Sequence, residues 1–144
     1  MSGKNNETII EVKGLSKVYE MGESTIHALR CVDVAIQRGT YCAVMGPSGS
    51  GKTTFLDIVG CLSRPTAGEY WLKGHLVSEY TEGQLAEMRN AEIGFVFQNF
   101  NLLPRSTALQ NVELPLLYCG VHRRDRARMA AAALEAVGLG ERLH

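Results

Sequence analysis

The sequence predicts an α/β fold in which an antiparallel β segment precedes a parallel sheet. Strand-like and helix-like stretches alternate through most of the chain, which is typical of α/β proteins. Residues 41–45 are apolar without alternation, as in a strand covered on both faces, and a glycine-rich loop and a helical pattern follow directly. The earlier strands come without helices between them, so we expect those strands to pair in an antiparallel way.

Two strands are predicted before the glycine-rich loop. Residues 8–13 are rich in β-branched side chains, which favour a strand. Apolar and other residues alternate within 26–37, which indicates a strand that is buried on one face. The polar, glycine-containing stretch 20–25 is expected to be a loop between them.

A helix, a hairpin and a second helix are predicted after the loop. Residues 52–62 place their apolar side chains on one helical face. A hairpin is expected at 69–76, because a lysine–glycine pair interrupts two strand-like stretches. Thr81 and Gln84 have the spacing of a capping box, so a helix should begin there and run towards Asn90.

The last third of the chain predicts one strand and two helices. Residues 93–97 form another apolar strand-like run. Thr107 begins a second capping box, and the helix that it opens should end or kink at Pro115. A further helix is expected over 123–137, with Gly138 placed to stop it.

Composition and charge argue against several classes of protein. The 144 residues are 45% hydrophobic and 21% charged, with 15 basic and 15 acidic side chains. A net charge of zero argues against a nucleic-acid-binding module, which usually carries a basic excess. The longest apolar run, 129–134, is far shorter than the roughly 20 residues of a membrane-spanning helix. The cysteines and histidines lack the spacing of a metal site.

The most informative motif is a phosphate-binding loop at residues 46–54, G-P-S-G-S-G-K-T-T. Gly46, Gly51, Lys52 and Thr53 occupy the defining positions of G-x-x-x-x-G-K-[ST]. Glycines let successive backbone N–H groups point into one concavity, and the following helix adds the positive end of its dipole. Lys52 is expected to reach the β- and γ-phosphates, and the Thr53 hydroxyl to bind Mg²⁺. The predicted nucleotide-binding residues of this motif are Gly46, Pro47, Ser48, Gly49, Ser50, Gly51, Lys52, Thr53 and Thr54.

Two other classes of phosphate-loop protein fit the sequence poorly. Residues 57–60 match the D-x-x-G pattern of GTPases, but they follow the loop on its own helix, where they cannot reach the γ-phosphate. The N-K-x-D pattern of GTPases does not occur. A small-molecule kinase would need acceptor-binding arginines in a lid, whereas the late arginines at 123–128 lie on an alanine-rich helix.

Four segments together resemble the ATP-binding subunits of ABC transporters. They are the aromatic segment 15–19, the strand and turn 26–39, the phosphate loop, and I-G-F-V-F-Q-N-F-N-L-L-P at 93–104. In this order and spacing the resemblance is highly specific, and it covers nearly the whole chain. The run 100–121 and the loop before His27 are similar to lipoprotein-releasing and macrolide-exporter ATPases.

The resemblance implies a fold, cofactors, partners and a location. The fold would be a partial P-loop NTPase core with an antiparallel β segment, over about 1–98, and the start of a helical subdomain, over about 99–144. The cofactors would be ATP and Mg²⁺. The partners would be a transmembrane permease and a second ATP-binding subunit, with no nucleic acid. The chain would lie in the cytoplasm, peripherally on the inner face of the cell membrane, without crossing it.

The resemblance also assigns roles outside the phosphate loop. Tyr19 would stack on adenine, although it could be an ordinary aromatic residue at a strand end. Gln98 would lie near Mg²⁺ and the attacking water, although it could simply cap the loop after its strand. The apolar residues 97–103 would receive a short helix of the permease, or else belong to a core. The arginines at 123–128 fit a solvated helix face better than a partner site.

The family's second-half motifs are absent from this sequence. They are an L-S-G-G-Q signature, an apolar run that ends in aspartate, the catalytic glutamate that follows it, and a switch histidine. The chain therefore resembles the N-terminal part only, and looks cut rather than redesigned. Besides an intact transporter ATPase, the sequence leaves open a non-catalytic nucleotide-binding fragment. Because phosphoryl transfer depends on positioning and charge stabilisation, we expect little ATP hydrolysis from these 144 residues alone.

Overall fold

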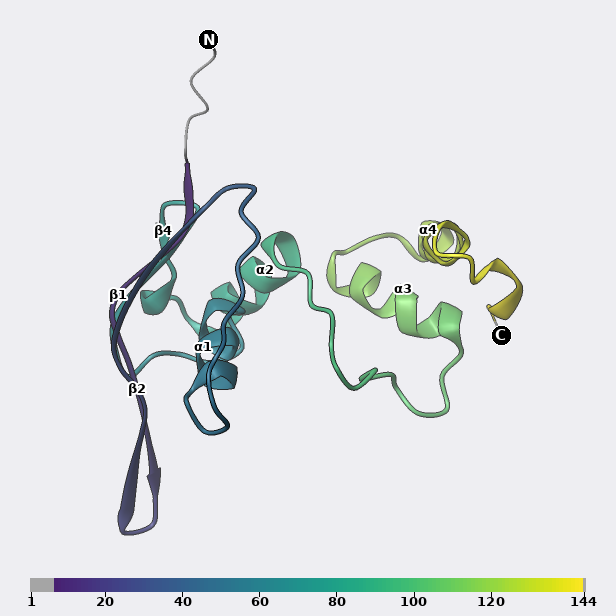
Figure 1. Cartoon of the computed structure of the whole chain (residues 1–144). Helices are drawn as coiled ribbons and strands as arrows, with labels where there is room; N and C mark the ends of the chain where they lie inside the picture. Colours follow the sequence, from purple (N-terminus) through teal and green to yellow (C-terminus); the bar gives the residue numbers. More distant parts are fainter. Residues whose placement is uncertain (1–6, 144) are drawn as a thin grey trace. The chain divides into compact units, whose positions relative to one another are not determined.

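The computed structural model describes residues 7–143, and the chain divides into two compact units. The first unit is Met1–Ile93 and the second is Gly94–His144. The first unit carries a four-stranded sheet and two helices, and the second carries two further helices (Figure 1).

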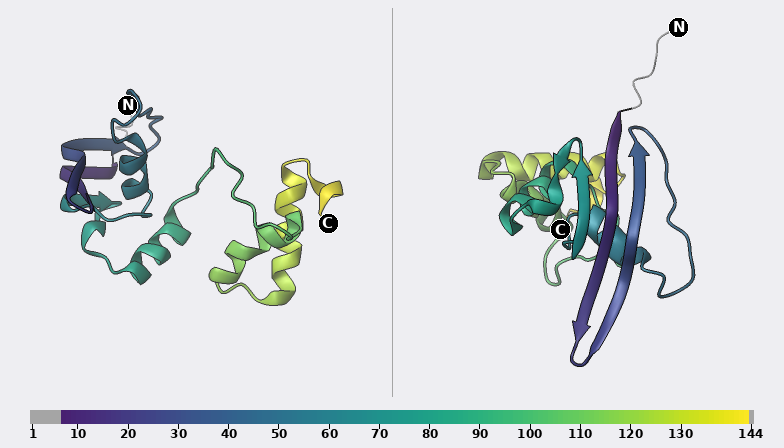
Figure 2. Two further views of the ribbon diagram at one scale, coloured as in Figure 1. Left: turned by 90° about the horizontal axis from the view of Figure 1, so that it is seen from below. Right: turned by 90° about the vertical axis from the view of Figure 1, so that its left-hand side faces the viewer.

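The sheet of the first unit is built around one long hairpin. Strands β1 (Thr8–Met21) and β2 (Ser24–Gln37) pair antiparallel, and Figure 2 shows them as a long two-stranded ribbon. Strands β3 (Ala67–Leu72) and β4 (His75–Leu76) complete the sheet in the order β2-β1-β3-β4. The antiparallel segment and the late hairpin are confirmed. The loop predicted at 20–25 is shorter, because strand pairing continues to the Met21–Ser24 pair.

One side of this sheet holds the core of the first unit. Helix α1 (Lys52–Val59) buries Phe55 and Ile58 in that core. The Tyr70 side chain is also buried, and its hydroxyl donates to the Val59 carbonyl at 2.7 Å, which ties β3 to the end of α1. The core consists of Val12, Leu15, Leu29, Phe55, Ile58, Cys61, Tyr70, Leu72, Val77 and Leu85.

Helix α2 (Glu82–Glu92) begins at the predicted capping box and follows the short helix η1 (Val77–Glu79). The Thr81 side chain accepts from the Gln84 backbone N–H, and the Gln84 side chain accepts in turn from the Thr81 N–H. Arg89 donates to the Cys61 carbonyl at 2.6 Å, and Lys73 pairs with Glu92. These contacts attach α2 to the rest of the first unit.

The prediction of strands at 41–45 and 93–97 is wrong. The prediction of a parallel sheet is also wrong for residues 7–143, which the structure describes. Neither segment forms a strand, and the strand pairs of the described residues are all antiparallel. An extended segment becomes a strand only beside a hydrogen-bonded neighbour. Tyr41 is 96% exposed and Met45 is 87% exposed, so neither is covered in the way that the apolar run predicted. Helix α1 is also shorter than predicted, since Gly60 caps it.

The second unit contains α3 (Ala108–Tyr118), α4 (Arg123–Ala136) and the short helix η2 (Gly140–Arg142). Ala130 and Leu134 of α4 are buried, and α3 and α4 contact each other. The capping box at Thr107 is confirmed, and Gly138 follows the end of α4 with φ +76°.

Helix α3 continues past Pro115 to Tyr118, so a helix end at Pro115, one of the two predicted outcomes, is wrong. Proline removes one backbone donor, but the turn after it closes again, since the Cys119 N–H donates to the Pro115 carbonyl at 3.0 Å. The Val121 N–H then donates to the Leu116 carbonyl at 3.0 Å. The helix therefore loses one bond at the proline without stopping.

Candidate phosphate-binding site

The glycine-rich loop enters α1 through a backbone shape that requires glycine. Gly51 is the N-cap of α1, with φ +87°, a left-handed conformation that side chains disfavour. A Cβ atom at Gly51 would also lie 3.0 Å from Cδ2 of Leu29 on β2. At Gly46, a Cβ atom would lie 2.7 Å from the Ser50 hydroxyl oxygen. The motif glycines thus let the loop fold on itself and let α1 begin directly against β2.

The N-terminus of α1 has no side-chain cap. Gly51 offers no capping hydrogen bond, and the first turn contains no acidic residue. In contrast, α2, α3 and α4 begin with side-chain caps from Thr81, Thr107 and His122. Because the first N–H groups of a helix need an acceptor, the start of α1 is suited to an anion.

The Lys52 ammonium lies within the loop. It donates to the Gly46 carbonyl at 2.9 Å and to the Pro47 carbonyl at 2.6 Å, and it lies 3.5 Å from the Ser50 hydroxyl. The structure therefore brings the two ends of the motif together around one positive charge. Thr53 is exposed on the first turn of α1, and Thr54 beside it is half-buried.

The residues around the loop fit a magnesium–nucleotide better than a metal held by protein alone. Among residues 7–143 there is no cluster of three or more His, Cys, Asp or Glu side chains that could hold a metal ion. A hydroxyl such as that of Thr53 can instead complete the coordination of Mg²⁺ whose other ligands are phosphate oxygens and water. The donor set of the loop, an ammonium and helical N–H groups, is complementary to phosphate.

Tyr19 lies near the end of β1, outside the loop but in the same unit. Its side chain is 39% exposed, and the residue pairs with Ile26 across the hairpin. The Lys17 ammonium lies 5.1 Å from the centre of the Tyr19 ring. The contact joins residues two positions apart on one strand, and it was not predicted from the sequence.

Gln98 lies in the second unit, whereas the phosphate loop lies in the first. Its side chain is exposed, and its predicted role near Mg²⁺ stays a prediction. The neighbouring apolar residues are exposed rather than packed in a core, with Phe100 86% exposed. Phe95 and Phe97 stack on each other, with ring centres 5.5 Å apart.

A pocket of about 340 Å³, lined mainly by apolar residues, borders the phosphate loop. Sequence reasoning missed this pocket, because the residues that line it come from separate parts of the first unit. The residues that line the pocket are Leu29, Val32, Val34, Ile36, Cys42, Ala43, Val44, Met45, Ser50, Gly51, Lys52 and Phe55.

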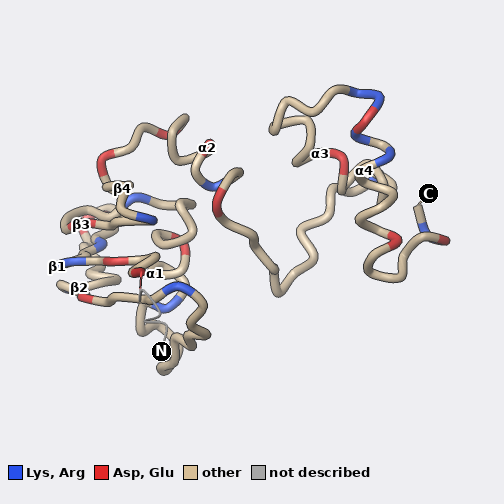
Figure 3. The backbone as a smooth tube through the Cα atoms, turned by 90° about the horizontal axis from the view of Figure 1, so that it is seen from above, with Lys and Arg blue, Asp and Glu red and all other residues tan. Residues whose placement is uncertain are grey.

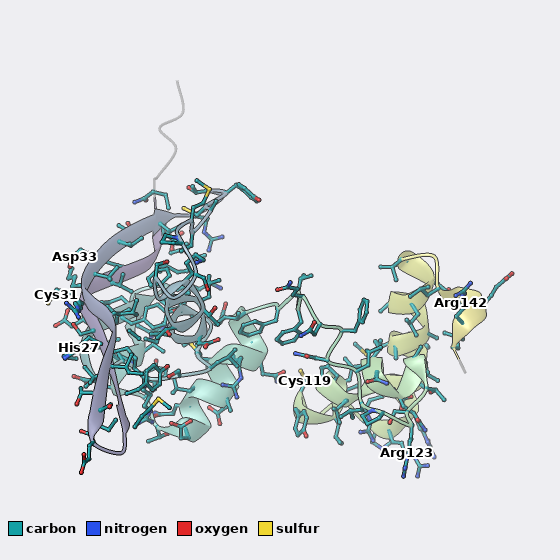
Figure 4. All side chains as sticks on the ribbon, turned by 60° about the horizontal axis from the view of Figure 1, so that its bottom comes forward. His27, Cys31, Asp33, Cys119, Arg123 and Arg142 are labelled. Carbon is teal, nitrogen blue, oxygen red and sulfur yellow. The ribbon has the colours of Figure 1, made fainter. Side chains whose placement is uncertain are left out.

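Three other side chains of β2 are exposed and lie along the side of the sheet away from α1 (Figure 4). They are His27, Cys31 and Asp33.

Four arginines of the second unit, at positions 123, 124, 126 and 128, lie in the first turns of α4 (Figure 3). Asp125 lies among them and forms an ion pair with Arg128 at 3.1 Å. Both partners of this pair are largely exposed, which is typical of a solvated helix face.

Comparison with known proteins gives the same family from sequence and from structure. A sequence model described as "ABC transporter" matches residues 29–144. An uncharacterized ABC transporter ATP-binding protein of Thermotoga maritima is 51% identical over 136 residues, which are 94% of this chain and 58% of that protein. The macrolide export ATP-binding/permease protein MacB of Bdellovibrio bacteriovorus is 47% identical over 94% of this chain and 21% of its own length.

The solved structures lead to the same family. The dimeric ATP-binding cassette MJ0796, in a post-hydrolysis state bound to ADP and Pi, superposes with a TM-score of 0.81 and 41% identity. The match covers 94% of this chain and 60% of that chain, so our chain spans about three fifths of the cassette. The fold is accordingly part of a P-loop NTPase core. The chain belongs to the ABC transporter family and corresponds to the N-terminal part of its ATP-binding domain.

Proposed function

We propose that this chain binds Mg-ATP at the phosphate loop, as the N-terminal part of the ATP-binding component of an exporting or lipoprotein-releasing transporter. The observation that carries the proposal is the Lys52 ammonium, which lies inside a loop that opens onto the uncapped start of α1. A solved relative bound to ADP and Pi supports a nucleotide as the ligand. In this proposal, the β segment and the core extend over about residues 1–98. The helical subdomain begins in the remaining part, over about residues 99–144.

Each residue of the proposed site has a distinct task. The N–H groups of the loop and of the first turn of α1 hold phosphate oxygens, and Lys52 neutralises charge on the β- and γ-phosphates. Thr53 supplies one oxygen ligand to Mg²⁺, which draws charge from the phosphates when it is bound. Tyr19 provides a flat apolar surface for the base. Gln98 belongs near the metal and the attacking water.

The proposed partners are a permease and a second ATP-binding subunit. MacB relatives carry an ATP-binding part and a permease in one protein, and the superposed cassette is dimeric. No helix within residues 7–143 is long and apolar enough to span a bilayer. The exposed residues Phe100, Leu102 and Leu103 offer an apolar surface to the permease. We place the protein on the inner face of the cell membrane, where ATP hydrolysis would drive export or lipoprotein release.

Calorimetric titration with ATP and Mg²⁺ tests the proposal. Lys52→Ala should abolish detectable binding, because the side chain supplies the positive charge inside the loop. Lys13→Ala is the matched control, since Lys13 is exposed on β1 and pairs with Glu11 at 3.0 Å. It should bind ATP as the unchanged chain does. Equal affinity in the Lys52→Ala variant and the control would disprove the phosphate-loop assignment.

A phosphate-release assay separates an ATPase from a non-catalytic fragment. The 144-residue chain contains no signature motif, and Glu92, one of its candidate carboxylates, is paired with Lys73. We expect phosphate release no faster than from the Lys52→Ala variant. Faster release would show that a carboxylate of this chain orients the attacking water.

A further inference from the structure

The Lys17 side chain connects Tyr19 to the segment that follows α1. Lys17 and Tyr19 are two residues apart on β1, so both side chains point to the same face of the hairpin. The Lys17 ammonium lies 5.1 Å from the Tyr19 ring centre, and it donates to the Arg64 carbonyl at 2.6 Å. The ammonium therefore has two fixed neighbours, one aromatic and one polar.

The backbone beside Tyr19 is attached to the same segment. The Thr66 N–H donates to the Ser16 carbonyl at 2.8 Å. The Val18 N–H donates to the Thr66 hydroxyl at 3.0 Å. These bonds fix β1 immediately before Tyr19, so the position of its Cα does not depend on Lys17. What Lys17 adds is a contact with the ring itself.

A cation within about 6 Å of an aromatic ring centre is attracted to the face of the ring. The Lys17 ammonium meets this condition, and its bond to the Arg64 carbonyl keeps it from swinging into solvent. One face of the Tyr19 ring is then occupied by a charge, and a flat ligand must stack on the other. A ring held in one orientation loses less conformational freedom when a base binds.

We infer that Lys17 is a positioning residue, which orients the Tyr19 ring so that one defined face receives the nucleotide base. The inference rests on the proposed function, because it assumes that Tyr19 stacks on the base. It differs from a direct role of Lys17 in phosphate binding, since its effect must pass through the ring.

Titrations with two ligands distinguish these roles. ATP has a base, whereas inorganic tripolyphosphate has the phosphates alone. Lys17→Met keeps most of the side-chain length and removes the charge, and Lys17→Arg restores a cation that can stack on the ring. Lys13→Met removes a lysine of the same strand that pairs with Glu11, and is the matched control.

An exposed cation–π contact predicts that Lys17→Met weakens ATP binding about two- to fivefold. Tripolyphosphate binding should stay unchanged, and Lys17→Arg should restore most of the affinity for ATP. In a Tyr19→Ala background, Lys17→Met should cause no further loss. The Lys13→Met control should match the unchanged chain with both ligands.

Other outcomes would overturn the inference. An equal loss for both ligands would make Lys17 a general electrostatic contact. A loss that persists in the Tyr19→Ala background would make it a structural anchor for β1. If ATP binding depends on Lys52 but not on Lys17, only this inference fails. If the unchanged chain binds no ATP, the inference and the proposed function fail together.

Discussion

The carbonyl oxygen of Ala28 on β2 occupies the space that a Cβ atom at Gly51 would need. The start of α1 therefore approaches the backbone of β2 at a distance that only glycine allows. Gly51 also has φ +87°, so two independent constraints act on one residue. The position of the phosphate loop on the sheet depends on this contact.

Gly51→Ala should destabilise the first unit and weaken ATP binding. The left-handed backbone costs about 1–2 kcal/mol for alanine. The overlap with Ala28 adds about 1–3 kcal/mol, as overpacking does in cores. Urea unfolding measures the loss of stability. Gly49→Ala is the matched control, because Gly49 has φ +79° but open space around its Cβ position. Equal losses in the two variants would show that the contact with Ala28 is relaxed at little cost.

Local signals in the sequence predicted the starts of α2 and α3 and the glycine after α4, but not the ends of α1 and α3. The capping boxes at Thr81 and Thr107 are present as expected, because each involves residues only three positions apart. The position of Gly138 after α4 was predictable for the same reason, because the left-handed residue that follows a helix depends on its immediate neighbours in sequence. The phosphate-loop motif could also be recognised in the sequence. In the structure, the Lys52 ammonium donates to the carbonyls of Gly46 and Pro47.

Contacts between distant residues were not readable from the sequence. The run 41–45 has the composition of a buried strand, but strand formation needs a neighbouring strand and not composition alone. The Lys17 bond to the Arg64 carbonyl joins residues 47 positions apart, and the Gly51 contact with Ala28 likewise requires the folded hairpin. These features depend on tertiary packing, which periodicity does not encode.

Thr53→Ala should remove the gain in ATP affinity that Mg²⁺ provides. The Thr53 hydroxyl is proposed as a ligand of the metal, and a polar contact with a charged group is worth about 1.5–3 kcal/mol, or tenfold and more in affinity. Titrations with Mg²⁺ and with a chelator measure the difference. Thr53→Ser keeps the hydroxyl and should retain the gain. Unaltered Mg²⁺ dependence in the alanine variant would remove Thr53 from the metal site.

Cys61 should resist alkylation and should make the stability of the first unit fall at alkaline pH. Burial raises the pKa of the Cys61 thiol above its ordinary value of 9.0, an effect partly offset by a hydrogen bond with Tyr70 and by the Arg89 charge. Well below pH 9.0 the thiol keeps its proton in both the folded and the unfolded state. As the pH rises through the pKa of the unfolded thiol, the unfolded thiol ionises before the folded one, so stability is lost.

Two measurements check this prediction. At pH 8, iodoacetamide should modify the exposed Cys31 and Cys42 well before Cys61, as followed by peptide mass spectrometry. Above about pH 9, the free energy of unfolding should fall less steeply for Cys61→Ala than for the unchanged chain. Burial raises the pKa of Tyr70 as well, so part of the fall should remain in the variant. Equal alkylation rates at all three cysteines would contradict the burial of Cys61.

The Asn111 side chain closes the loop before α3. Its Oδ1 accepts from the Leu103 N–H at 2.7 Å, and its Nδ2 donates to the Thr107 carbonyl at 2.9 Å and to the Ser106 carbonyl at 3.4 Å. The Asn111 amide group thus accepts a hydrogen bond from one N–H and donates hydrogen bonds to two carbonyls. Arg105 lies within this loop with φ +65°, a conformation that needs support from its surroundings.

Asn111→Ala should raise the exchange rate of the Leu103 amide proton about two- to twelvefold, because it removes a bond worth about 0.5–1.5 kcal/mol. Asn111→Asp keeps the acceptor for Leu103 but turns a carboxylate towards two carbonyl oxygens. At pH 7 it should therefore lose stability as well, and at acid pH the protonated side chain can donate once and recover part of it. Amide exchange followed by NMR measures both effects, with the Gln110 amide as the internal control, since it is bonded to Thr107 and not to Asn111. If Asn111→Asp were as stable as the unchanged chain at pH 7, the two donated bonds would contribute nothing, and the acceptor for Leu103 alone would hold the loop.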